Sequence, residues 1–219
     1  MLKVVVFDNG YGGEFFADIL KEELPVVEII RVIDWRHAEA IQENPRKARK
    51  LAEVALKPYI GKVDLIIFAN FLIGITSVHY FSRRYKNQRF IGLQLKRPDN
   101  ASQKDVIILT TKAITKTIGY YNYLLHIHRK TKTIILDTWP AKIDDGELTK
   151  AEIEQALKPQ IKDRSGSKEI VIACSQFYDL KPELRDLFGH NLKIYDGFND
   201  TIREVCKILK VRGSAKKIK

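Results

Sequence analysis

The chain has 219 residues, of which 45% are hydrophobic and 30% are charged, and its formal net charge is +11 at pH 7. This composition supplies a sizeable core, and no apolar run approaches the roughly 20 residues that a transmembrane helix needs. Cys174 and Cys206 are the only cysteines. We therefore expect a reduced, cytoplasmic protein without a disulfide framework, a zinc site or a membrane segment.

Apolar runs with strand character alternate with helical stretches along the chain. The predicted strands cover residues 3–7, 28–33, 63–68, 89–93, 106–109, 133–136, 169–173 and 192–195. Continuous apolar strands that alternate with helices are typical of parallel sheets covered on both faces. The sequence therefore predicts the α/β class.

Three of the predicted helices have clear signals. The Asn-Pro pair at residues 44–45 is a cap followed by a first-turn proline, which predicts a helix to about residue 56. Thr149 and Glu152 form a capping box before the next apolar run. The last predicted helix spans residues 199–209, and its apolar face is made of Ile202, Val205, Cys206 and Leu209.

A faint internal repeat links the two halves of the chain. KVVVFDN at residues 3–9 is similar to DVIILTT at 105–111, and VDLIIFAN at 63–70 is similar to KEIVIACS at 168–175, with offsets of 102 and 105 residues. We expect two similar three-layer α/β lobes with mostly parallel sheets, related by a pseudo-twofold and separated by a cleft. Ligands of open α/β sheets bind beyond the carboxyl ends of the strands. The predicted strand ends at Asp8, Ala69, Thr110 and Cys174 should therefore line that cleft.

Two strand ends carry candidate chemistry. The glycine-rich turn at residues 8–13 would let backbone N–H groups approach an anion, although it lacks the spacing of a dinucleotide fingerprint and the lysine of a P-loop. Cys174 ends a strand and precedes Ser175 and Gln176, so its thiol is a candidate base or nucleophile. The alternative is a small buried hydrophobic side chain. We expect this structural role for Cys206.

Five segments, in order along the chain, resemble the motifs of one known protein family. FDNGYGG (7–13) is similar to F-D-S-G-x-G-G, and IIFANF (66–71) is similar to a strand that ends in A-C-N-T. ILTTKAITKT (108–117) is similar to I-x-T-x-A-T, and IACSQF (172–177) to G-C-T-H-F. IYDGFNDTIREV (194–205) is similar to a closing D-S-G segment and last helix. In this order the five motifs resemble those of the aspartate/glutamate racemase family.

This resemblance implies that the first and last segments share a lobe. The lobes would comprise residues 1–95 with 196–219, and residues 96–195. In that family two cysteines face each other across the substrate α-carbon, and no cofactor or metal is needed. Polar side chains and backbone amides hold the carboxylates and stabilise the developing enolate.

The chain departs from the family pattern at several of these positions. Ala69 replaces the first cysteine and cannot move a proton, Phe71 replaces a threonine, and Asn9 replaces a serine. Gln176 stands where a histidine is expected, and residues 39–41 do not supply the family's P-Y-G turn. The resemblance still implies Cys174 and Asp8 as catalytic residues, and it implies a substrate-binding set made of Asn9, Asn70, Phe71, Thr111, Ser175 and Gln176.

Another group could replace the missing thiol, and the nearest candidates in the sequence are Asp8, Tyr11 and His79. The other histidines match no catalytic position, and we expect them on the surface. They are His37, His126, His128 and His190.

Three functions remain open. The first is an enzyme that binds a small carboxylic acid between the lobes and moves a proton with Cys174 alone, as a decarboxylase or isomerase rather than a two-base racemase. The second is an inactive racemase fold with a binding or regulatory role. The third is a glutamate racemase with a substitute base that supplies D-glutamate for peptidoglycan. A homodimer is compatible with the sequence, and the basic clusters favour at most weak, non-specific polyanion binding.

Overall fold

Eight strands form two separate parallel sheets of four strands each in the part of the chain that the structure describes. The structure is a computed structural model that describes residues 1–38, 44–95, 97–98, 105–128, 130–159 and 168–213. Backbone contacts divide the chain into two units. Unit 1 is Met1–Leu95 with Gly197–Lys219, and unit 2 is Lys96–Asp196.

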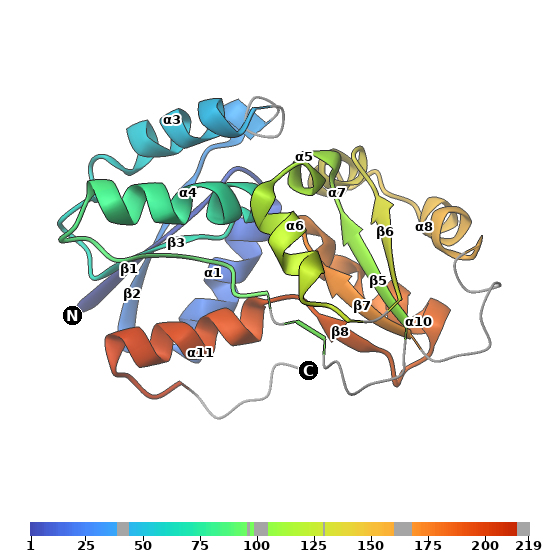
Figure 1. Ribbon diagram of the computed structural model, residues 1–219. Coiled ribbons are helices and arrows are strands. Elements are labelled where there is room, and N and C mark those ends of the chain that lie inside the picture. The colour runs from blue at the N-terminus through green and yellow to red at the C-terminus, as the bar shows by residue number, and fades with distance from the viewer. Residues whose placement is uncertain (39–43, 96, 99–104, 129, 160–167, 214–219) are drawn as a thin grey trace. The chain divides into compact units, whose positions relative to one another are not determined.

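The sheet of unit 1 has the strand order β2-β1-β3-β4, and all its neighbouring strands are parallel. Figure 1 shows its helices on both faces of the sheet. The elements of unit 1 are β1 (Leu2–Asp8), α1 (Tyr11–Glu23), β2 (Val27–Ile33), η1 (Trp35–His37), α3 (Pro45–Leu56), β3 (Leu65–Phe68), α4 (Phe71–Arg84), β4 (Phe90–Gly92) and α11 (Phe198–Leu209).

Alternate residues of the central strands divide the core of unit 1 into two layers. Val5 and Phe7 point to the face that α3 and α4 cover, where they join a cluster of fully buried side chains. Val4 and Val6 are also fully buried and point to the opposite face, because side chains alternate along a strand. The unit is therefore a three-layer α/β sandwich.

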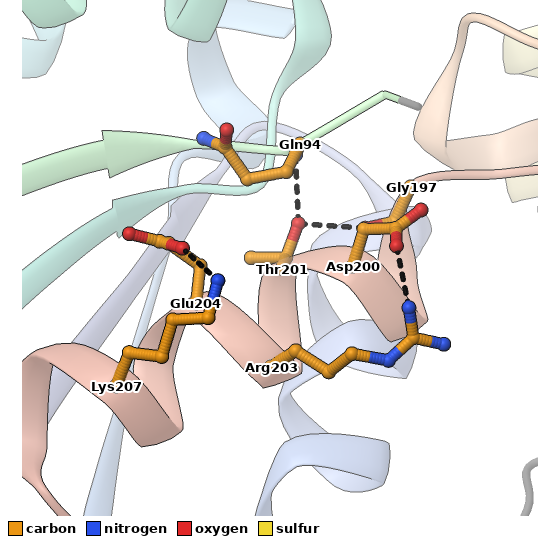
Figure 2. Close-up of polar contacts among 7 residues, drawn as sticks. All are labelled: Gln94, Gly197, Asp200, Thr201, Arg203, Glu204 and Lys207. Carbon is orange, nitrogen blue, oxygen red and sulfur yellow. Dashed lines mark hydrogen bonds and ion pairs between the residues drawn. The ribbon is translucent and has the colours of Figure 1, made fainter. Parts of the chain in front are cut away.

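The last helix, α11, belongs to unit 1, and hydrogen bonds at its first turn hold it in place (Figure 2). The hydroxyl of Thr201 donates to the carbonyl of Gly197 at 2.7 Å and accepts the backbone N–H of Gln94 at 2.8 Å. Gly197 has φ +81°, and a Cβ there would lie 3.3 Å from the carbonyl oxygen of Gln94. A glycine is needed because both the left-handed backbone and the close approach of residue 94 disfavour a side chain.

The sheet of unit 2 has the equivalent order β6-β5-β7-β8, again with parallel neighbours. The elements of unit 2 are β5 (Asp105–Thr110), α5 (Lys112–Thr115), α6 (Ile118–Leu125), β6 (Thr131–Ile135), α7 (Trp139–Asp144), α8 (Lys150–Leu157), β7 (Lys168–Ile172), η2 (Ser175–Leu180), α10 (Lys181–Phe188) and β8 (Lys193–Tyr195). The same strand order in both units explains the sequence repeat, because β5 corresponds to β1 and β7 to β3.

The core of unit 2 is also built on two faces. Ile107 and Leu109 pack with α7, α8, η2 and α10 in one buried cluster. Thr133 pairs with Ile108 and so points to the opposite face, where its hydroxyl lies 2.8 Å from that of Tyr120 on α6. Helices therefore cover both faces of this sheet, as the sequence predicted.

The predicted elements are confirmed, with shifts at some boundaries. The side chain of Asn44 accepts the N–H groups of Arg46 and Lys47 at 2.9 and 3.2 Å, and the capping box of Thr149 and Glu152 is formed. The strand expected at residues 133–136 instead begins at Thr131. The first residues of this strand are polar, so hydropathy alone does not indicate them as strand residues. They pair with β5 through the backbone.

None of the helices in the described ranges is long and apolar enough to cross a membrane.

Candidate active site

Asp8 and Ala69 lie at the carboxyl ends of the neighbouring strands β1 and β3. Phe7 pairs with Phe68, and the N–H of Ala69 donates to the carbonyl of Phe7 at 2.8 Å, so the two chains leave the sheet side by side. Both Asp8 and Ala69 are fully buried. This edge of unit 1 is where the sequence predicted one half of the site.

The turn after β1 is packed tightly around Asp8. The Asp8 carboxylate accepts the N–H of Asn9 at 2.7 Å. A Cβ on Gly13 would lie 2.1 Å from the Cβ of Asp8, which is far inside van der Waals contact. The glycine therefore lets α1 begin directly against the aspartate, so it contributes close packing at this position.

Two asparagine amides join the ends of β1 and β3. Asn70 caps α4 by accepting the N–H of Ile73 at 2.8 Å, and its Nδ2 donates to Oδ1 of Asn9. Asn9 in turn donates to the carbonyl of Ala38 at 3.3 Å. Both asparagines are buried, and their amides are held within the fold.

The positions that depart from the family pattern are apolar and buried. Ala69 has no exposed surface, and Phe71 is the first residue of α4 with 8% of its surface exposed. Unit 1 thus offers a methyl group and an aromatic ring where the resemblance implies a thiol and a hydroxyl. Residues 39–41, where the P-Y-G turn was sought, lie outside the described residues.

Cys174 and Thr111 take neighbouring places at the ends of β7 and β5 in unit 2. Leu109 pairs with Ile172. Thr111 lies two residues after Leu109, and Cys174 lies two residues after Ile172. Thr110 ties the strand ends together, because its hydroxyl donates to the carbonyl of Ala173 at 3.3 Å. The sequence prediction that places Cys174 at a strand end is met.

The thiol of Cys174 is bonded within the turn that follows it. Its Sγ lies 3.2 Å from Oε1 of Gln176, which also accepts the Ser175 hydroxyl at 3.3 Å. Cys174 is 6% exposed and contacts the hydrophobic core of the unit. The side chain therefore stands at the boundary between a polar turn and the apolar interior.

Thr111 differs from its polar neighbours in this half of the site. It is the N-cap residue of α5, but its side chain makes no capping bond. Its hydroxyl has no hydrogen-bond partner within the described ranges, and the residue is 7% exposed. A hydroxyl that makes no hydrogen bond within the fold can donate to and accept from a ligand.

The candidates for a substitute base are unequal. Tyr11 is half-exposed and stacks on Phe15 with ring centroids 6.4 Å apart. His79 is exposed on α4, nine residues after Asn70 and thus ~13 Å along the helix axis from the end of β3. Asp8 remains the candidate that lies at a strand end. The other histidines are all exposed: His37, His126, His128 and His190.

A buried ion pair at the start of α10 was not found by sequence reasoning. Lys181 Nζ lies 2.5 Å from Oδ2 of Asp196 and 3.8 Å from the centroid of the Tyr178 ring. Both charged side chains are at least 90% buried. Burial, followed by the charge of Asp196, raises the pKa of Tyr178 to about 12, so its hydroxyl stays neutral. Of the two residues in this ion pair, the sequence motifs singled out only Asp196, in the segment at 194–205.

These features define a class of α/β protein with two topologically equivalent parallel sheets and polar residues at the ends of their central strands. No protein-family model matches the chain. Glutamate racemase from Clostridium perfringens strain SM101 is 26% identical over 227 residues, which cover 97% of this chain and 85% of that protein.

Solved structures have the same fold. Escherichia coli glutamate racemase, in complex with L-glutamate and the activator UDP-MurNAc-Ala, superposes with a TM-score of 0.79 at 15% identity, over all of this chain and 86% of that one. Aspartate racemase from Picrophilus torridus gives a TM-score of 0.63 at 13% identity, over 98% of this chain and 96% of that one. The sequence relatives support membership in the aspartate/glutamate racemase family, as the motifs predicted, and the solved structures show that the fold is shared.

Proposed function

We propose that the protein is a cofactor-independent enzyme that acts on a small carboxylic acid by proton transfer at Cys174 alone. The observation that supports this most directly is the position of Cys174 and Thr111, each two residues beyond the paired residues Ile172 and Leu109 of adjacent strands. The thiol, which is bonded to Gln176, and the Thr111 hydroxyl, which makes no capping bond, then lie at neighbouring strand ends. This combination suits an acid/base group beside a carboxylate-binding group.

The proposed chemistry needs one acid/base group. The Cys174 thiolate would take the α-proton of the bound acid, or its thiol would protonate the enediolate left by decarboxylation. In both cases the proton moves on one face of the α-carbon. The hydroxyls of Thr111 and Ser175 would donate to the oxygens on which negative charge develops.

The residues at the strand ends of unit 1 favour a single-face reaction. Inversion of a stereocentre needs a second acid/base group on the opposite face, and Ala69 supplies none at the position where the family has its first cysteine. The Phe71 ring makes this region apolar. We therefore propose a substrate that is less polar than glutamate, such as a 2-aryl acid.

Proton exchange in heavy water tests this function. Purified protein would be incubated in deuterium oxide with a panel of amino acids and 2-aryl acids, and the α-proton signal would be followed by proton NMR. We expect one acid to gain deuterium while it keeps its configuration. Cys174→Ala should abolish the exchange, and the matched variant Cys206→Ala should retain it.

Two outcomes would contradict single-cysteine chemistry. Exchange that persists in Cys174→Ala would assign the proton transfer to another group. Racemisation of glutamate or aspartate, seen as a loss of circular dichroism and lost again in Cys174→Ala, would favour the racemase alternative. Asp8 would then be the first candidate for the substitute base to test by mutation, because it ends the strand that pairs with the strand before Ala69.

A binding protein without catalysis is the second candidate, and the hydrogen bonds of the site favour it. The amides of Asn9 and Asn70 bind each other and the backbone, and the Cys174 thiol is bonded to Gln176. Binding of an acid from the panel in saturation-transfer NMR, without any deuterium exchange, would support this candidate. Thr111→Val should weaken such binding, whereas Thr138→Val, an exposed threonine, should not.

A further inference from the structure

Unit 1 contains a pocket away from the strand ends. It lies beside α3 and the turn that follows it, next to the end of α4, and its volume is about 520 Å³. This falls within the range of roughly 300–1,000 Å³ typical of small-molecule sites. Lys50, Glu53, Val54 and Lys57 line it from one face of α3, at the i, i+3, i+4 and i+7 spacing that brings helix residues together. We call it the α3–α4 pocket.

The charges of the α3–α4 pocket are unbalanced. Glu53 is neutralised locally, because its carboxylate lies 2.6 Å from Nε of Arg84 and accepts the hydroxyl of Tyr85. Lys50 and Lys57 are exposed and have no acidic partner within the described ranges. Two lysines at a pocket without a carboxylate to pair with them create a local excess of positive charge.

The remaining lining is apolar and aromatic. Val54 is 74% exposed, and Ile60 and the Tyr85 ring border the same space. Arg84 lies over the Tyr85 ring, with its guanidinium carbon 5.7 Å from the centroid. The hydrogen bond to Glu53 raises the pKa of Tyr85, so the tyrosine hydroxyl itself is uncharged at neutral pH.

We propose that the α3–α4 pocket binds a small phosphorylated ligand with an aromatic ring, which is the chemistry of a nucleotide. The ring packs against Val54, Ile60 and Tyr85, and the phosphate oxygens accept hydrogen bonds from Lys50 and Lys57. Lysine is a common phosphate ligand because its ammonium group is a compact charge with three donors. This site is independent of the chemistry proposed at Cys174.

Fluorescence displacement tests the proposal. The probe is 8-anilinonaphthalene-1-sulfonate, which combines aromatic rings with one anionic group, and the competitors are AMP, ATP, adenosine and inorganic phosphate. We expect AMP and ATP to displace the probe. Adenosine lacks the charge and inorganic phosphate lacks the ring, so each should compete more weakly than AMP.

Paired variants locate the binding. Lys50→Gln with Lys57→Gln should weaken AMP binding about tenfold, because two charge-assisted contacts are lost. Lys21→Gln with Lys116→Gln removes the same charge from exposed positions elsewhere and should change the affinity less than about twofold. Val54→Glu should abolish binding by placing a carboxylate at the mouth of the pocket, and Val26→Glu, at another exposed valine, should not.

Three results would overturn the proposal. One is the absence of competition by AMP and ATP. Another is equal weakening in the two lysine pairs, which would show a general effect of net charge. The third is displacement by an oligonucleotide but not by AMP, which would assign the basic surface to non-specific polyanion binding. Because the readout is fluorescence, failure here would leave the exchange experiment on Cys174 unaffected.

Discussion

The Cys174 thiol lies 3.2 Å from the side-chain oxygen of Gln176, and this amide oxygen is also the acceptor for Ser175. An amide oxygen can accept a hydrogen bond from a thiol but cannot give a proton to it. The contact therefore favours the protonated cysteine in the resting protein. Gln176 takes the position at which the family resemblance implies a histidine. We therefore expect the protonation of the Cys174 thiol to depend on an amide instead of an imidazole.

Removing the amide should make Cys174 more reactive. In a Cys206→Ala background, Gln176→Met deletes the acceptor but retains a long side chain in the buried turn. We expect the rate of alkylation by iodoacetamide at neutral pH to rise about fivefold, which corresponds to the ~1 kcal/mol of one hydrogen bond. Mass spectrometry over time gives the rate. An unchanged rate would mean that the contact does not govern the thiol.

Restoring the missing groups in unit 1 should change the outcome of the reaction. Ala69→Cys returns a second thiol, and Phe71→Thr returns a hydroxyl at the start of α4. If the parent protein exchanges an α-proton on one face, the double variant should slowly racemise the same acid, as measured by circular dichroism. The loss of the buried Phe71 ring should also cost about 3 kcal/mol of unfolding free energy. Exchange that keeps its configuration in a folded double variant would contradict this prediction.

The ion pair between Lys181 and Asp196 should matter for the stability of unit 2. Both side chains are buried, so Lys181→Met should remove the counter-charge that Lys181 supplies to the Asp196 carboxylate and lower the unfolding free energy by about 3–5 kcal/mol. The double variant Lys181→Met with Asp196→Leu should recover part of this loss. Urea denaturation of the parent protein, Lys181→Met, Asp196→Leu and the double variant measures the coupling energy between the two side chains. Additive losses would show that the pair is energetically independent.

Cys206 provides a prediction about pH. Burial raises the pKa of its thiol, so less thiolate is present in the folded protein than in the unfolded chain at a given pH. In Cys174→Ala, where Cys206 is the remaining thiol, alkylation at pH 8.5 should be slower in the folded protein than in urea. The difference should shrink as the pH rises through the folded pKa. Equal rates at pH 8.5 would contradict it.

Several features were predictable because they depend on neighbours in the sequence. The eight strands follow from apolar runs, and the starts of α3 and α8 follow from Asn44 and Thr149, whose side chains bond to N–H groups within the next three residues. The placement of Cys174 at a strand end followed from the length of the EIVIA run. The order of five motifs was enough to predict the resemblance to the aspartate/glutamate racemases.

Other features were settled only by the tertiary structure. The bond between Asn9 and Asn70 joins residues 61 positions apart, and it exists because β1 and β3 pair in one particular register. The Lys181–Asp196 pair and the α3–α4 pocket likewise bring together side chains from separate elements. No pattern of local hydrophobicity encodes such contacts. Strand register and helix packing depend on the whole core, so the partners of a buried polar group become fixed only when the core forms.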